Sequence, residues 1–308
     1  MAKKNLLRRT SVFGLVALIA FLGAAGACAW SPKAADYPVT PELLAIDLPH
    51  RLRSGPEHDA ALRRVGNPYI LDVEDSSGAL CYYGARHATD RSDPQIKDIE
   101  DRWAKFRPTA ALCEGRSRGY FLGWPFEQLG GLSEPALVHK LARRSGIPIY
   151  SLEPRYEDEV AALLKSWSPE QVGLYFTMRV YWSEAGGTPD EGLAENLLRK
   201  RTDVEGLRGS LKSAADIDRV WKRDFVNQPD WRGLQGEPDG TYLAEISEAS
   251  RTVRGEHMAR VLIDLVRKGG RVFAVVGSGH VIRQEWALRA ALGAQPAEDQ
   301  PVATAVAE

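Results

Sequence analysis

The chain twice closes an apolar run with the motif Gly-x-x-His, first ending at His87 and again ending at His280. Two other short apolar runs are each followed by a glutamate, Glu114 and Glu153. Imidazoles and carboxylates are the side chains that ligate Mn, Co or Zn and transfer protons near neutral pH. If the four runs are neighbouring strands, these residues converge on a site that can hold a divalent metal and activate water.

Each of these residues alone has a simpler interpretation. A single histidine after a strand is more often a loop residue or a helix cap than a ligand. A glutamate at a strand end often begins the next helix, where its charge suits the helix dipole, and Glu153-Pro154 fits that pattern. The repeated glycine spacing favours an active site, because glycine permits the sharp turn that aims a side chain over a sheet edge.

The apolar runs alternate with helical patterns. Residues 67–84 predict two strands joined by a Ser-Ser-Gly turn, and an Asp93-Pro94 start predicts a helix that stops before Pro108. Strands 109–113 and 147–152 follow, separated by a second helix. This alternation predicts an α/β fold, a mainly parallel sheet with helices on both faces and an opening β-hairpin. Ligands bind such sheets at the carboxyl ends of the strands, so the four site residues are expected around one crevice.

The folded α/β domain is expected over residues 67–293. Residues 30–66 contain scattered prolines and predict a linker, or an arm lying on the body. Residues 294–308 lack an apolar period and predict a disordered tail. The segment 186–242 breaks the rhythm of strands and helices and predicts a helical insertion, either a lid over the strand ends or a packed surface subdomain.

The first residues have the character of a targeting segment. Residues 1–29 place basic side chains ahead of an apolar run rich in small residues, which predicts an export signal. Cleavage, lipid attachment at Cys28 and retention as a membrane anchor are all open, and Arg8-Arg9 also permits twin-arginine export. The chain is therefore expected in the periplasm or cell envelope, in contact with the membrane through an N-terminal lipid or anchor.

Composition limits the partners. Forty Lys and Arg residues balance 41 Asp and Glu residues, so no nucleic-acid partner is expected. A peptide or a small molecule is the expected substrate. Outside the signal only Cys81 and Cys113 remain, too few for a disulfide framework or a cysteine zinc site, and both are expected to be buried thiols rather than a disulfide.

One further residue is marked by its position on a long helix near the end of the body. Arg254 heads a stripe at helical spacing that continues through Met258, Val261 and Leu265. An arginine on an apolar face requires a carboxylate or a ligand anion, unless it extends to solvent.

In order and spacing these residues resemble the TraB/PrgY/GumN superfamily, which includes the Tiki metalloproteases. The family pattern has two Gly-x-x-His motifs, a Glu after one strand, a Leu-Glu before a helix, and an Arg-Asn-x-x-Met helix. The matching positions over residues 68–293 are His87, Glu114, Leu152-Glu153, Arg254 in RGEHM, and His280. Gly255 replaces the usual Asn, and Arg86 lies inside the first motif, two departures that bear on the substrate.

The resemblance to Tiki implies metal-dependent hydrolysis of a peptide or amide bond, so with the export signal the expected function is that of an exported hydrolase of a peptide, amide or ester bond. It implies His87, Glu114 and His280 as ligands of Mn, Co or Zn. It also implies catalytic roles for Glu114, Glu153 and Arg254, with the arginine steadying an anion.

More distant structural relatives of the family imply two alternatives. The erythromycin esterases imply hydrolysis without metal, with a histidine as general base. The ChaN haem-binding lipoproteins imply a protein that binds haem or another small ligand without catalysis. Such a protein needs an exposed axial ligand, for which Tyr82, Tyr83 and Tyr120 are candidates.

Overall fold

The computed structural model describes residues 30–31, 34–86, 92–115, 120–121 and 134–293. The export segment 1–29 with Cys28, the tail 294–308 and the candidate ligand His87 lie outside these ranges. Within them the chain has a mixed, mostly parallel sheet with helices, so the predicted α/β fold is confirmed.

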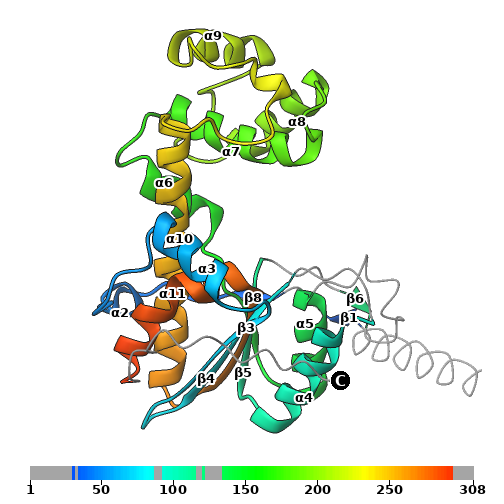
Figure 1. Cartoon of the computed structure of the whole chain (residues 1–308), viewed down its shortest axis with the longest axis vertical. Helices are drawn as coiled ribbons and strands as arrows, with labels where there is room; N and C mark the ends of the chain where they lie inside the picture. Colours follow the sequence, from blue (N-terminus) through cyan, green and yellow to red (C-terminus); the bar gives the residue numbers. More distant parts are fainter. Residues whose placement is uncertain (1–29, 32–33, 87–91, 116–119, 122–133, 294–308) are drawn as a thin grey trace, which may run out of the picture.

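A six-stranded sheet with the order β2-β7-β5-β8-β4-β3 forms the centre of the α/β part (Figure 1). Neighbours run parallel except β3 and β4, which form the predicted opening hairpin. A separate antiparallel pair is made by β1 (Trp30–Ser31) and β6 (Tyr120–Phe121). The strands of the main sheet are β2 (Ala35–Asp36), β3 (Tyr69–Glu74), β4 (Ala79–Ala85), β5 (Ala110–Cys113), β7 (Ile149–Ser151) and β8 (Arg271–Gly277).

Helices cover both faces of this sheet because its central strands are apolar on both sides. Along β4, Leu80 and Tyr82 pack against one helical layer, whereas Cys81 and Tyr83 pack against the other. Cys81 and Cys113 are buried thiols, as the sequence predicted. The first layer is α10 (Tyr242–Arg267) and α11 (Ser278–Ala291); the second is α4 (Pro94–Phe106) and α5 (Glu134–Ser145).

Helix α4 shows how local sequence sets an element. The Asp93 side chain accepts a hydrogen bond from the Gln95 amide at 3.0 Å, and Pro94 occupies the first turn. Ile99 and Trp103 on its apolar stripe are buried against the sheet. The helix ends at Arg107, whose φ of 51° is left-handed, just before Pro108.

The described residues of the segment 30–66 form an arm against the body. Its strand β2 pairs with β7 at the sheet edge, and its helices are α2 (Pro41–Leu44) and α3 (Gly55–Arg64). Between these helices the arm touches α10: a Cβ on Gly255 would lie 2.7 Å from Leu52 Cδ1. Gly255, which departs from the family pattern, therefore lets the arm approach α10 closely.

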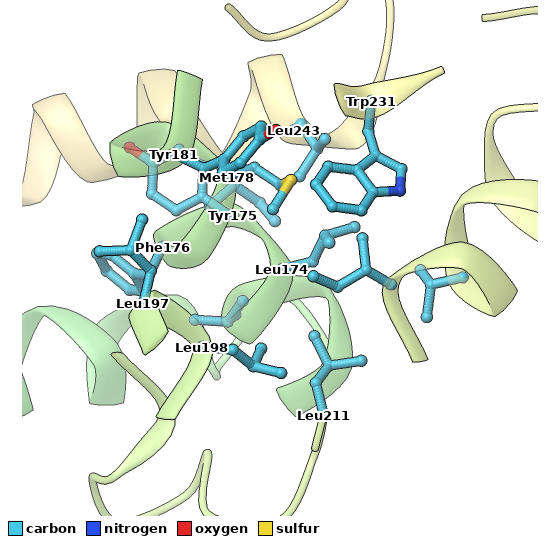
Figure 2. Close-up of a cluster of buried hydrophobic side chains, with 14 of the residues drawn as sticks. Leu174, Tyr175, Phe176, Met178, Tyr181, Leu197, Leu198, Leu211, Trp231 and Leu243 are labelled. Atoms are coloured by element: carbon cyan, nitrogen blue, oxygen red, sulfur yellow. The ribbon is translucent and has the colours of Figure 1, made fainter. Parts of the chain in front are cut away.

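A second core lies away from the sheet, in a helical region (Figure 1), and Figure 2 shows some of its buried side chains. Trp231 is 1% exposed and stacks edge-on with Tyr181 at 5.2 Å. The region starts before residue 186, the predicted beginning of the insertion, because the buried residues of α7 belong to the same cluster as those of α8. Its elements are α6 (Tyr156–Leu163), α7 (Pro169–Ala185), α8 (Glu191–Thr202), α9 (Ala214–Asp224), the 3-10 turn η2 (Trp231–Gly233) and the start of α10.

Helix α10 joins the two cores (Figure 1). Leu243 and Ile246, near its start, pack in the helical region, whereas Met258 to Val266 pack on the sheet. The residues between these two groups, including Arg251 and Arg254, therefore pass the edge of the sheet. None of the described helices, α10 included, is long and apolar enough to cross a membrane.

Candidate active site

The two Gly-x-x-His motifs begin side by side. Strands β4 and β8 are parallel neighbours, and Ala85 is paired with Gly277. A Cβ on Gly84 would lie 2.7 Å from Ser278 Cα and 2.7 Å from the Tyr69 carbonyl oxygen. Only glycine fits between these backbone segments, so the first motif lets the start of α11 pack against the end of β4.

Three of the four sequence-marked residues meet at the carboxyl edge of the sheet. Glu114 follows β5, Glu153 follows β7, and His280 lies in the first turn of α11, directly after β8. One ligand atom from each side chain lies within 4.8 Å of the others. The fourth residue, His87, falls outside the described residues.

Glu114 is held by the second motif. Its Oε2 accepts a hydrogen bond from the Gly277 amide at 2.8 Å, and its Oε1 lies 3.3 Å from His280 Nε2. Burial alone would raise the pKa of this carboxyl. The contacts with His280 and Gly277 and the charge of Arg254 outweigh that effect and lower the pKa from 4.5 to about 2. Glu114 is therefore an ionised carboxylate near neutral pH, the form that binds a cation.

Glu153 is held by Arg254 from the middle of α10. The guanidinium donates from Nε to Glu153 Oε2 at 2.7 Å and from Nη2 to the other carboxylate oxygen. The two side chains are only 12% and 17% exposed. The arginine that heads the apolar stripe thus finds a carboxylate in a bidentate pair, which fixes the carboxylate's orientation.

A crevice of about 880 Å³ opens beside this cluster, and Glu153 is not among the residues that line it. Glu114 and His280 line it together with residues from α3, α10 and α11. Its charged wall contains four arginines, Arg86, Arg251, Arg254 and Arg283. Guanidinium groups around a small polar cluster favour negative charge on a bound ligand, or on an oxygen that becomes negative during a reaction.

Sequence reasoning missed several of these wall residues. Arg283 follows His280 by one turn of α11 and so shares its side of the helix, a local signal that was available. His58 and Asp59 come from α3, in the segment expected to be a linker or an arm. The stretch from Ser54 to Glu57 forms a capping box, so the helix that carries His58 was detectable.

Two of the three tyrosines proposed as axial haem ligands are buried in the sheet. Tyr82 and Tyr83 have 0% exposure. The Tyr82 hydroxyl donates to Gln284 at 3.2 Å, and burial raises its pKa well above 10. A haem iron at an exposed pocket cannot reach these two side chains.

A comparison of the chain with models of protein families, with curated proteins and with solved structures finds no match. The functional conclusion therefore depends on the geometry of the site.

Proposed function

We propose that this chain is an exported, metal-dependent hydrolase of a peptide, amide or ester bond, similar to the TraB/PrgY/GumN superfamily. One observation carries the proposal: Glu114, Glu153 and His280 offer ligand atoms within 4.8 Å of one another at the ends of three parallel strands. Ligand sites of parallel α/β sheets occur at this edge.

The donor set suits a divalent cation. Two carboxylates and an imidazole are ligands that Zn, Mn and Co accept, and three protein ligands leave a position for water or substrate. The pairing of Glu153 with Arg254 leaves lone pairs on both carboxylate oxygens. When bound, the cation would supply Lewis acidity that activates water and polarises the scissile carbonyl.

The residues of the chain then have separate roles. Glu114 and His280 are the ligands already expected, and the position of Glu153 adds it to them. Arg254 acts through Glu153 by holding the carboxylate in one orientation, as outer partners of metal ligands do. His87 remains a predicted ligand.

Export remains part of the proposal on sequence grounds alone. Residues 1–29 have the features of a signal, and Cys28 is the position for a lipid. Cell fractionation tests this: the mature chain should be found in the envelope, and Cys28→Ser should release it from the membrane if the cysteine is lipidated. A full-length chain that remains in the cytoplasm with its first residues intact would refute export.

A second candidate function is favoured by the contact between His280 and Glu114. A carboxylate 3.3 Å from an imidazole can hold it in the tautomer that accepts a proton from water. Such a pair can hydrolyse an ester without metal, as the resemblance to the erythromycin esterases implies. Chelation distinguishes the two candidates.

The test uses full-length protein purified without chelator and assayed on 4-nitrophenyl acetate and on a mixture of quenched fluorescent peptides. We expect a chelator to abolish turnover and Mn²⁺, Co²⁺ or Zn²⁺ to restore it. His280→Ala should lower the rate by about 100-fold or more, since a Lewis acid contributes several kcal/mol. The matched control His50→Ala changes an exposed arm histidine and should retain activity. Turnover that survives chelation but is lost in His280→Ala would support the metal-free candidate.

A further inference from the structure

The crevice contains a second histidine that belongs to neither Gly-x-x-His motif. His58 lies on α3, and its side chain is 20% exposed at the crevice wall. Its Nδ1 is 3.0 Å from Oδ1 of Asp59, which also lines the crevice. A carboxylate that accepts the Nδ1 hydrogen leaves Nε2 with a free lone pair.

The arm segment before α3 is anchored to α11, the helix that carries His280. The Arg53 amide donates to the Arg283 carbonyl oxygen at 2.9 Å, and the Arg53 guanidinium pairs with Glu285 at 3.1 Å. Both partners of that pair are buried, with side chains 7% and 4% exposed. Glu57 bonds back to Ser54 in the capping box that starts α3. The position of His58 relative to α11 is therefore fixed by contacts on its own helix and just before it.

The His58 ring lies over the first turn of α11. A Cβ on Gly279 would be 3.1 Å from His58 Nε2 and 3.7 Å from its Cε1. A Cβ at the first of these distances would force the His58 ring to move by a few tenths of an ångström. Gly279, next to His280 in the sequence, thus gives the imidazole room to approach the site.

The two glutamates of the site are already engaged as hydrogen-bond acceptors. Both oxygens of Glu153 accept from Arg254, and Glu114 accepts the Gly277 amide and faces His280. In the proposed hydrolase these two carboxylates, together with His280, hold the cation. When these side chains hold the cation, a different group in the crevice can accept the proton from the attacking water.

We propose that His58, oriented by Asp59, is the catalytic proton-transfer residue of this crevice. The inference rests on the proposed hydrolysis. An imidazole bonded through Nδ1 to a carboxylate can serve through Nε2 as a general base and then as a general acid, and Nε2 of His58 lies beside Gly279, which lines the crevice.

In the proposed hydrolysis, His58 first accepts and then returns one proton. Nε2 of His58 takes a proton from water as the water oxygen bonds to the carbonyl carbon and the π electron pair moves to the carbonyl oxygen. Arg251 and Arg254 line the crevice, and the positive charge that they add to its wall can favour that negative charge, although Arg254 is also paired with Glu153. When the carbonyl re-forms, the bond to the amine nitrogen or alcohol oxygen breaks, and His58 returns its proton to that leaving group. One water is consumed, and no oxidant or reductant is required.

The charged groups that share the crevice with His58 come from five elements or their ends. Asp59 lies on the same helix, Arg251 and Arg254 on α10, His280 and Arg283 on α11, and Arg86 and Glu114 at the ends of β4 and β5. A pH profile would combine all of them, so the test uses turnover, metal content and chemical rescue.

The experiment compares His58→Ala, His58→Gln and the matched control His50→Ala on the quenched fluorescent peptide mixture. We expect kcat of both His58 variants to fall by about 10²- to 10⁴-fold while metal content per chain is unchanged. Added imidazole should partly restore His58→Ala but not His280→Ala. Peptides are the probe because imidazole does not cleave them on the time scale of the assay. His58→Gln keeps a donor for Asp59 and covers the case in which the alanine variant fails to fold.

Each outcome has one meaning. An active wild type with His58 variants within about threefold of its kcat would overturn the inference and leave the proposed hydrolase intact. Loss of metal together with activity in His58→Gln would also overturn it, because His58 would then be a ligand or a structural residue. A wild type inactive on both peptides and 4-nitrophenyl acetate would refute the proposed function, and this inference with it.

Discussion

The helical region and the carboxyl edge of the sheet differ in the polar groups that they bury. In the helical region many buried polar atoms belong to large apolar side chains, although Glu159 of α6 is also buried there and accepts a hydrogen bond from the Ser250 hydroxyl. The indole N–H groups of Trp182, Trp221 and Trp231 each donate to one oxygen at 2.9 to 3.0 Å, and the rings fill the core. At the sheet edge, ionisable groups themselves are half-buried, with Glu114, Glu153 and His280 clustered against Arg254.

The two kinds of buried group contribute differently to the stability of the fold. Aromatic burial with satisfied N–H groups contributes several kcal/mol per side chain. Charges removed from water contribute little net stability, because the cost of desolvation offsets their attraction. The cluster at the sheet edge is therefore better explained by function than by folding.

Truncation in the helical core should give the largest effect on stability. We expect Trp231→Ala to lower the free energy of unfolding by about 3–5 kcal/mol, since the ring is 1% exposed and its removal leaves a cavity. The control Val226→Ala changes a side chain that is 77% exposed and should stay within about 0.5 kcal/mol. Chemical denaturation followed by circular dichroism measures both. Equal, small effects would remove the distinction between the two regions.

Substitution of Gly84 at the sheet edge should lower both the free energy of unfolding and the rate of hydrolysis. Gly84→Ala places a methyl group 2.7 Å from backbone atoms of Ser278 and Tyr69, which cannot yield as a flexible side chain would. We expect a loss of about 1–3 kcal/mol in unfolding free energy and a drop in hydrolysis rate, because the start of α11 must shift. Gly66→Ala is the matched control, with nothing within 4 Å of the new methyl group. If both variants behave alike, the packing of the motifs does not constrain the site.

Protonation of Glu114 at acid pH should cause the smallest of these losses in the free energy of unfolding. Its pKa in the folded chain, about 2, is lower than the ordinary 4.5. The ionised carboxylate therefore stabilises the fold above pH 4.5, and this contribution is lost as the pH falls from 4.5 towards 2. After allowance for solvent screening we expect a loss on the order of 1 kcal/mol. Denaturation of metal-free wild type and Glu114→Gln at about pH 6 and about pH 3 measures it. Identical losses in both proteins would contradict the assignment to Glu114.

Local sequence rules were enough for much of the fold. The hairpin β3–β4 and the capped start of α4 at Asp93 follow from turn and cap chemistry within a few residues. The rule that parallel strands share a carboxyl edge also placed Glu114, Glu153 and His280 together. These features depend on short patterns and on the topology that the patterns define.

The remaining features depend on contacts between distant segments. The pairing of Arg254 with Glu153 joins residues 101 positions apart, and the sequence showed only that the arginine needed a partner. The contact of His58 with Gly279 depends on the packing of the arm against α11. The ion pair between Arg53 and Glu285 holds the arm there. Periodicity and spacing within one sequence do not indicate contacts between distant segments. His58 therefore becomes a candidate for proton transfer only once the structure shows its position.

The central claim is that three strand ends build a binding site for a divalent metal, and calorimetric titration of metal-free protein with Zn²⁺ and with Mn²⁺ tests it most directly. We predict one site per chain in the wild type. Because loss of an outer partner of a ligand costs 10- to 100-fold in metal affinity, loss of a ligand in His280→Ala or Glu114→Gln should cost about 100-fold or more. His50→Ala should bind like the wild type. Absence of binding in the wild type, or unchanged affinity in both ligand variants, would contradict the account.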